Sequence, residues 1–552
     1  MGKKKKSNSF LVQGTILAVA SILAKIIGMI YRIPLTNILG DEGNSYYSTA
    51  NEIYTILLMV SSFSLPLAVS KLVSERLHLG QKKNAYKVFK CSLKFAVIAG
   101  GIVSVLTFLL AGVISKDIMK TEMASYGLRV LAPAVFIFAI AGVFRGFYQG
   151  HGSMVPTAVS QVIEQIVNAV VSVAAAGILF NYGASIVKEK GNSLENSSLP
   201  PALGAAGGTL GTVVSVAVAL IFLMVIFSSY QRNFKKQMRQ DPTKRLEPDA
   251  LIYKAILMTI IPVVLSTVIY NIITVLDQGI FNAVLSGQGY TEKQYTIIWG
   301  VYVGKFRVLM NVPLALASCL APSVVPSLTK AMVDHDFKDA SIKVRNTIRY
   351  TMVITIPCAV GMAALATPIM KLLFNDGRAL TTGIMQTGAL MIVLFALSTL
   401  TTGILQGLNQ LRAPLIHAAI ALVLHIFVLM LLLTKASLNI YSVVYANIFF
   451  AFVICILNAL SIKKHLHYRQ ELKKTFLIPL LSSAVMGLIV FGVQWVFNKF
   501  LGNAVSTIIA ILIGVIVYCV CLIKLKGIRE REILELPKGR LMVAILKKCR
   551  IL

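Results

Sequence analysis

The chain has 552 residues, of which 57% are hydrophobic and only 14% are charged. Soluble domains carry about 25% charged residues, so this composition excludes an ordinary soluble protein and indicates a membrane protein. The formal net charge is +31. The cations lie in short segments between apolar runs, which argues against nucleic acid binding and favours contact with anionic lipid headgroups.

Apolar segments long enough to cross a bilayer recur along the whole chain. They predict an all-α, polytopic membrane protein with about fourteen transmembrane helices. The predicted spans are 10–39, 46–77, 85–114, 124–149, 155–183, 202–230, 250–285, 295–330, 343–374, 380–407, 413–434, 438–462, 476–498 and 503–524.

The first span carries two cations, Lys25 and Arg32, which are seven residues apart and therefore close to one helix face. A charge at membrane depth costs at least about 2.5 kcal/mol, so such residues usually face a partner or a water-filled cavity. We expect a cavity that receives an anionic group. In the alternative interpretation, Arg32 extends to the membrane surface and Lys25 pairs with a carboxylate such as Glu52 or Asp277.

Loop charge predicts the orientation of the chain. Loops on the side of the N-terminus hold several times more Lys and Arg than the opposite loops, for example at Lys82, Lys87, Arg239 and Lys463. This bias places both termini in the cytoplasm and the 184–201 loop on the opposite side of the membrane.

The halves of the chain resemble each other. Residues 145–149 (RGFYQ), followed by Pro156, correspond to residues 406–410 (QGLNQ), followed by Pro414. Two six-helix lobes related by a repeat are a transporter architecture. The predicted organisation is an N-terminal lobe at 1–230, a cytoplasmic basic linker at 231–248, a second lobe at 249–465, two further helices at 466–525 and a basic cytoplasmic tail at 526–552.

Signatures of soluble enzymes, including the P-loop, are missing from the sequence, so we predict a protein that is not an enzyme and holds no cofactor. Transport would then use an ion gradient or the membrane potential, and coupling to Na⁺ or to H⁺ stays open. His417 and His425 are either a proton relay or packed, hydrogen-bonded histidines.

Other polar residues within predicted spans suggest further parts of a site. Lys305 and Arg307 in the eighth span could supply cations to an anion site on the first lobe. Four more residues are candidates for coupling or structural roles: Glu52, Asp277, Glu164 and Asn311. The same charges could instead neutralise one another and hold the helices together.

Three segments resemble a known family: AKIIGMIYRIPLTNILG (24–40), RGFYQGHGSMVPTAVSQVIEQ (145–165) and NVPLALASCLAPSVVPSL (311–328). They are similar to the polysaccharide-biosynthesis branch of the MOP exporter superfamily, and within it to the MurJ-type (YtgP/SpoVB-like) group of Firmicutes. The resemblance covers essentially the whole chain.

The resemblance implies a flippase that moves undecaprenyl-pyrophosphate-linked sugars, above all lipid II, to the outer face of the membrane. It also implies a cationic cavity lined by helices one, two and eight, to which Lys25, Arg32 and Lys305 or Arg307 correspond. The second span departs from this pattern, because it has no Arg or Lys between Glu52 and Ser70. Cell-wall synthesis enzymes are candidate partners. Flippases for capsular, teichoic or O-unit intermediates, a cation-coupled multidrug exporter and a membrane scaffold are the alternatives.

Overall fold

The computed structural model describes residues 2–191, 193–243, 246–318, 320–410, 412–466, 468 and 470–527. Regular structure within these ranges is helical, and no β-strand occurs in them. The predicted all-α class is therefore confirmed. The basic tail after Gly527 and two linker cations, Lys244 and Arg245, lie outside the described residues.

By its internal contacts, the chain divides into two units, Met1–Gly304 and Lys305–Leu552. The first unit includes two helices beyond the predicted N-terminal lobe, α7 and α8, which contact α2 and α1 respectively. The predicted lobe boundaries stay a prediction, since contacts within a unit do not define an internal repeat.

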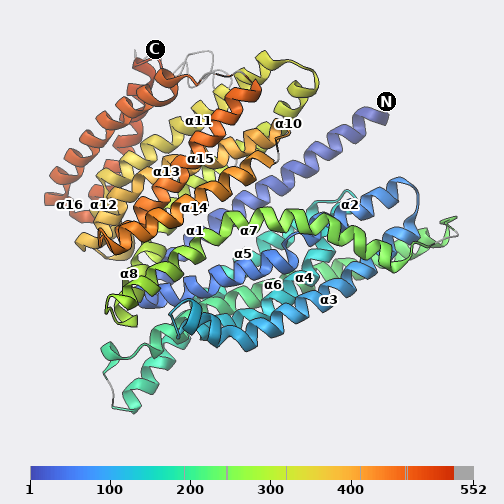
Figure 1. Ribbon diagram of the computed structural model, residues 1–552, viewed down its shortest axis with the longest axis horizontal. Coiled ribbons are helices and arrows are strands. Elements are labelled where there is room, and N and C mark those ends of the chain that lie inside the picture. Colours follow the sequence, from blue (N-terminus) through green and yellow to red (C-terminus); the bar gives the residue numbers. More distant parts are fainter. Residues whose placement is uncertain are drawn as a thin grey trace. The chain divides into compact units, whose positions relative to one another are not determined.

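The first unit is built from long helices. In Figure 1, α3, α4, α5 and α6 run side by side, and adjacent members of this set pack on one another. Short π-helical turns follow α1, α3 and α8. The helices are α1 (Gly2–Leu58), α2 (Leu65–His78), α3 (Lys82–Val113), α4 (Ala124–Gly150), α5 (Val155–Glu189), α6 (Leu199–Arg239), α7 (Asp249–Gly287) and α8 (Glu292–Val301).

Helix α1 consists of two helical halves that meet at a break at Gly40, where φ is +66° and ψ is −176°. A positive φ is strained for residues with a Cβ, so glycine suits this break. Asn44 stabilises the break, because its Nδ2 donates to the carbonyl oxygens of Thr36 at 2.9 Å and Gly40 at 2.6 Å. The two halves of α1 fold back on one another, which brings Arg32 onto the ring of Tyr47.

Helices α5 and α6 approach closely because α6 presents small residues to α5. A Cβ on Gly207 or Gly211 would overlap the backbone of Ala175 or Ser172. The close approach also allows a hydrogen bond between the helices, in which the Ser172 hydroxyl donates to the carbonyl of Gly208 at 2.8 Å. Small residues at helix contacts are the usual means of close packing in membranes, where lipid removes the hydrophobic driving force.

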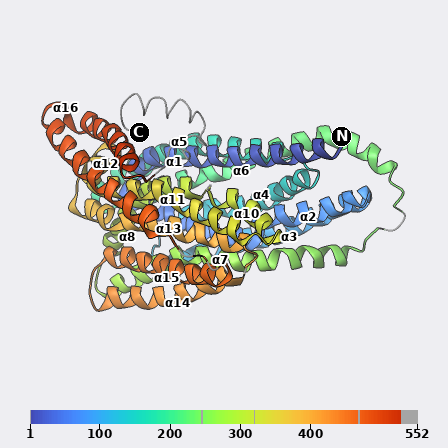
Figure 2. The same cartoon turned by 90° about the horizontal axis from the view of Figure 1, so that it is seen from above.

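The second unit is also helical. Helices α14 and α15 lie side by side in Figures 1 and 2 and contact each other. A break at Gly502 divides α16 into two halves, and Met486 and Val490 of the first half contact Gly514 of the second. The helices are α9 (Arg307–Ser318), α10 (Leu320–Val333), α11 (Phe337–Ala364), α12 (Ala366–Phe374), α13 (Ala379–Gly407), α14 (Arg412–Thr434), α15 (Ile440–Leu466) and α16 (Ile478–Lys524).

Eleven helical segments among the described residues are long and apolar enough to cross a membrane. Two of them, 19–78 and 473–524, contain the breaks at Gly40 and Gly502. The multi-pass character is thus confirmed, whereas the count of fourteen and the orientation stay predictions. One detail differs from the sequence-based expectation: α6 continues to Arg239, so the first half of the predicted 231–248 linker is helical.

The predicted orientation can be tested at the two ends of α6. Ser193 lies in the loop before this helix and Ser229 lies near its other end, and both are exposed. Single cysteines at these positions, in a background without native cysteines, should react with a membrane-impermeant maleimide from opposite sides. Labelling of Cys at position 193 from outside and at 229 only after permeabilisation is expected. Equal labelling from outside would contradict the orientation.

Candidate functional site

The two cations of the first span lie on the face of α1 that also carries Ser21 and Gly28, since 21, 25, 28 and 32 follow helical spacing. This face adjoins polar residues of α5. The Ser21 hydroxyl donates to Oε1 of Gln161 at 3.3 Å, and a Cβ on Gly28 would lie 3.3 Å from Oε1 of Gln165. The predicted placement of both cations on one face therefore agrees with the helix geometry, and the neighbouring helix adds two amides.

Arg32 is the better defined of the two cations. Its guanidinium carbon lies 4.3 Å from the centre of the Tyr47 ring, which is a cation–π arrangement. Nη1 of Arg32 is buried and has no hydrogen-bond partner among the described residues. Lys25 is exposed and takes part in an interaction of its own. Stacking on Tyr47 orients the guanidinium while leaving donor capacity for a bound anion.

A hydrogen-bond chain continues beside Arg32. Nδ2 of Asn168 donates to the Tyr31 hydroxyl at 3.1 Å, and Oδ1 of Asn168 lies 2.8 Å from the Ser172 hydroxyl, whose one hydrogen it shares with the carbonyl of Gly208. These bonds join α1 to α5 and, through Gly208, to α6. The chain fixes the position of Tyr31, the neighbour of Arg32 in α1, as a preorganised binding site requires.

The acids of the first unit differ in their surroundings. Glu164 accepts from Nη2 of Arg145 at 2.7 Å in a buried ion pair, and Arg145 also donates to the Ser160 hydroxyl at 3.1 Å. Glu52 accepts from the Ser48 hydroxyl at 3.3 Å. Asp277 is buried and has a partner within the structure. Glu164 thus joins α4 to α5 and already has a charge partner.

In the second unit, Lys305 is buried and its Nζ lies 2.6 Å from Oδ2 of Asp376. Asp376, in the loop before α13, also accepts from Nη2 of Arg378 at 2.6 Å and from the Thr381 hydroxyl at 2.8 Å. Burial raises the pKa of this carboxyl, but the hydrogen bonds from Arg378, Lys305 and Thr381 outweigh it and hold the pKa well below its usual range. The Lys305 charge is therefore compensated inside the unit.

The remaining predicted polar residues are dispersed within the second unit. Arg307 is half-buried and has a partner, and Asn311 is exposed. Nδ1 of His417 lies 2.8 Å from Oδ1 of Asn458, and Nδ1 of His425 lies 2.9 Å from the carbonyl of Ala446. Both histidines are thus hydrogen-bonded within the bundle, which agrees with the packing interpretation.

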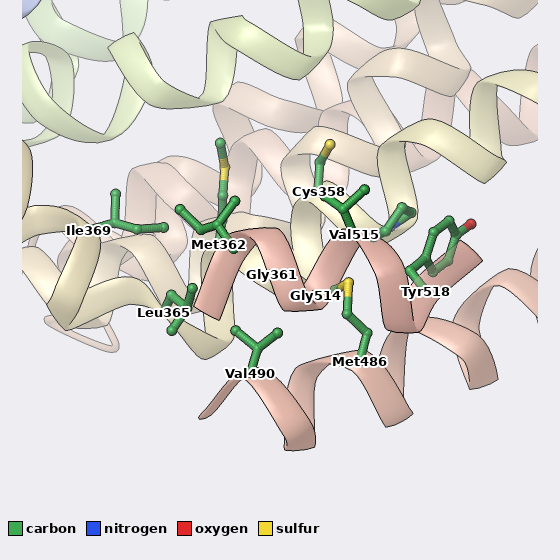
Figure 3. A pocket seen from close by; sticks show the side chains of 12 residues that line it. Cys358, Gly361, Met362, Leu365, Ile369, Met486, Val490, Gly514, Val515 and Tyr518 are labelled. Atoms are coloured by element: carbon green, nitrogen blue, oxygen red, sulfur yellow. The ribbon is translucent and has the colours of Figure 1, made fainter. Parts of the chain in front are cut away.

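An apolar groove of about 320 Å³ lies between α11, α12 and α16 of the second unit. Figure 3 shows Met362, Leu365, Met486 and Val490 at this groove. Its polar member, Tyr518, donates its hydroxyl hydrogen to the carbonyl of Val353 at 2.7 Å. The lining suits hydrocarbon and offers no group that would bind a charged headgroup.

Two residues of these networks were not predicted from the sequence as parts of a site: Arg145 and Asp376. In the sequence, Arg145 belongs to the repeated segment 145–149, and Asp376 lies in a short loop after a predicted span. The sequence does indicate that Lys305 needs a partner, because a lysine within a membrane span requires a carboxylate or a water-filled cavity. Nothing in the spacing identifies position 376 as the partner, since 71 residues separate the two.

Comparison with known proteins defines the class. The fold is similar to the inward closed conformation of the lipid II flippase MurJ, with a TM-score of 0.65, 15% identity and coverage of 92% of this chain and 98% of the other. An inward-facing multidrug resistance MATE family transporter of the MOP superfamily gives a TM-score of 0.63, with 17% identity and coverage of 81% and 98%. The protein therefore has the fold of MOP superfamily transporters.

The chain belongs to the polysaccharide biosynthesis protein family, whose model matches residues 11–332. Among curated relatives, the lipid II flippase MurJ of Bacillus subtilis (strain 168) is 26% identical over 544 residues, which covers 93% of this chain and 95% of the relative. The predicted family is thus confirmed. The protein is a multi-pass membrane protein of a family of transporters and flippases.

Proposed function

We propose that this protein is a flippase for undecaprenyl-pyrophosphate-linked peptidoglycan precursor, lipid II. It would move this lipid from the inner to the outer face of the bacterial cytoplasmic membrane by alternating access, with both chain termini in the cytoplasm. The observation that carries the proposal is the pair of cations on one face of α1, in which Arg32 is stacked on Tyr47 and retains a buried, unpartnered Nη1.

The chemistry of these cations fits a pyrophosphate. Arginine binds phosphate oxygens in a bidentate manner, and lysine is a strong point charge. Lys25 lies about 10 Å along α1 from Arg32, given the helical rise of about 1.5 Å per residue. This spacing suits an extended, doubly anionic group better than a single small anion. The polyprenyl chain remains in the hydrocarbon layer.

The roles of the second-unit residues follow from their partners. Arg307 and Lys305 are proposed to contribute further cations to the substrate site. Because Lys305 is bound to Asp376, its contribution requires an exchange of partners during transport. The substrate would then make different contacts in the inward-facing and outward-facing states. A ligand can shift the equilibrium between two conformations only if it binds them with different affinity.

A second candidate function is export of another lipid-linked oligosaccharide of the capsular, teichoic or O-unit type, because all of these share the pyrophosphate. Export of cationic drugs is less well supported, since the charged residues of the first span are both basic. Cationic substrates usually require acidic residues in the cavity, and two acids, Glu164 and Asp376, already have basic partners.

Complementation tests the proposal. A strain depleted of its own lipid II flippase should grow when this chain is expressed, and the accumulated precursors, measured by mass spectrometry, should return to normal. Failure to restore growth at normal membrane abundance would contradict a lipid II role. Restoration only in a strain that lacks a capsular or teichoic flippase would favour the second candidate.

A further inference from the structure

A basic pocket of about 380 Å³ lies in the first unit, between the start of α3, Met238 of α6, and Leu246 and Asp249 at the start of α7. Four lysines of α3 line the pocket together with one acid. The lining includes Lys83, Lys87, Lys90, Lys94, Tyr86 and Asp249. The lysines follow the spacing i, i+4, i+7 and i+11, so they form one stripe along the helix, about 16 Å long.

The first two lysines of this stripe bind residues 241, 247 and 249, which lie between the end of α6 and the start of α7. Nζ of Lys83 donates to the carbonyl of Asp241 at 2.9 Å. Nζ of Lys87 lies 2.7 Å from Oδ1 of Asp249 and donates to the carbonyl of Glu247 at 2.6 Å. The only acid of the lining is thus already paired, so these two lysines have a structural role.

The other two lysines do not share this role. Lys90 and Lys94 are exposed, and neither forms an ion pair among the described residues. Nζ of Lys90 lies 5.0 Å from the centre of the Tyr86 ring. These two ammonium groups lie one helical turn apart. Because the one acid of the lining is already paired with Lys87, they leave an uncompensated positive charge on the lining of the pocket.

The helix surface beyond Lys94 is apolar and exposed. Val97 and Ile98 have 42% and 62% of their surface accessible, and the exposed apolar residues continue along α3 to Ile102, Val105 and Leu109. In a membrane this face meets hydrocarbon. Lys90 and Lys94 therefore lie where the apolar face ends, at the depth at which lipid phosphates meet a spanning helix.

We propose that this pocket binds the phosphate headgroup of an anionic glycerophospholipid, with its acyl chains along the exposed face of α3. Lys90 and Lys94 bind the phosphate, and Tyr86, which lies on the side of Lys90 away from the apolar face, borders the polar end of the headgroup. A soluble phosphate would use the same lysines but not the apolar face, so the continuity of that face favours the lipid. This site is separate from the proposed substrate cations, Lys25 and Arg32, and does not depend on the proposed function.

Lipid titration of the purified full-length protein, followed by native mass spectrometry, tests the site. Phosphatidylglycerol and phosphatidylcholine with identical acyl chains are compared on the parent, on Lys90→Gln/Lys94→Gln and on the control Lys463→Gln/Lys464→Gln. The control removes two exposed lysines at the end of α15. Phosphatidylglycerol binding should weaken by about tenfold in the first variant and by less than about twofold in the control.

Three results would overturn the proposal: equal weakening in both variants, no preference of the parent for phosphatidylglycerol, or displacement of the lipid by millimolar inorganic phosphate. The single variant Lys94→Gln keeps Lys90 and should give an intermediate loss, which preserves the test if the double variant is unstable. Lys25→Ala should leave phosphatidylglycerol binding unchanged, so failure of this site and failure of the flippase proposal are distinguishable.

Discussion

Alanine at Lys25 or at Arg32 should abolish complementation of a flippase-depleted strain while the protein still reaches the membrane at normal abundance. Each cation supplies a charge-assisted contact worth roughly 1.5–3 kcal/mol, which corresponds to about tenfold to a hundredfold in affinity for the pyrophosphate. Growth under depletion and immunoblotting of membrane fractions provide the measurement. Lys188→Ala, at an exposed lysine near the end of α5, is the matched control and should behave like the parent.

Conservative substitutions separate the requirement for charge from the requirement for geometry. Lys25→Arg should retain more function than Lys25→Gln, because an exposed point charge can be replaced by another cation. Arg32→Lys should lose more function than Lys25→Arg, since lysine lacks the planar group that stacks on Tyr47. Restoration of activity when Lys25→Ala is combined with neutralisation of Glu52 or Asp277 would assign Lys25 a structural role instead.

Asp376→Ala should strongly destabilise the protein. This substitution removes the carboxylate that Lys305, Arg378 and Thr381 share, and breaking a buried ion pair costs about 3–5 kcal/mol. A lower unfolding midpoint of the detergent-solubilised protein, measured by differential scanning fluorimetry, is expected at neutral pH. Because the pKa of Asp376 is depressed, its stabilisation is present above the ordinary aspartate pKa of about 3.9 and is lost as the pH falls below it.

Asp339→Asn is the matched control for this experiment. Asp339 pairs with Lys343 at 2.6 Å on a partly exposed face of α11, where such a pair contributes only about 0.3–0.5 kcal/mol. Its unfolding midpoint should stay close to that of the parent. If the unfolding midpoint fell equally in the two variants, the buried pair of Asp376 would be no more stabilising than the exposed pair of Asp339. That result would contradict the structural role assigned to Asp376.

The helical fold could be predicted from the sequence because membrane spans are long, apolar and separated by polar segments. The breaks at Gly40 and Gly502 fall between predicted spans, in the gaps 39–46 and 498–503. The end of α6 was harder to predict. Its basic residues up to Arg239 mark the end of the hydrophobic region. They do not mark the end of the helix, because lysine and arginine are good helix formers.

The candidate site was predictable only in part. Helical periodicity alone puts Lys25 and Arg32 on one face. The ring beneath Arg32 was not predictable, because Tyr47 reaches it only through the reversal of the chain at Gly40. The ion pairs of Arg145 with Glu164 and of Lys305 with Asp376 likewise depend on packing between helices, which residue spacing in one sequence does not encode.

Reconstitution tests the flippase proposal most directly. Purified protein is incorporated into vesicles that contain lipid II, and an impermeant muramidase added outside measures how much lipid II becomes accessible over time. A protein-dependent increase is expected for the parent, and Arg32→Ala vesicles should match protein-free vesicles. No increase with the folded parent under an applied ion gradient or membrane potential, in either protein orientation, would contradict the account.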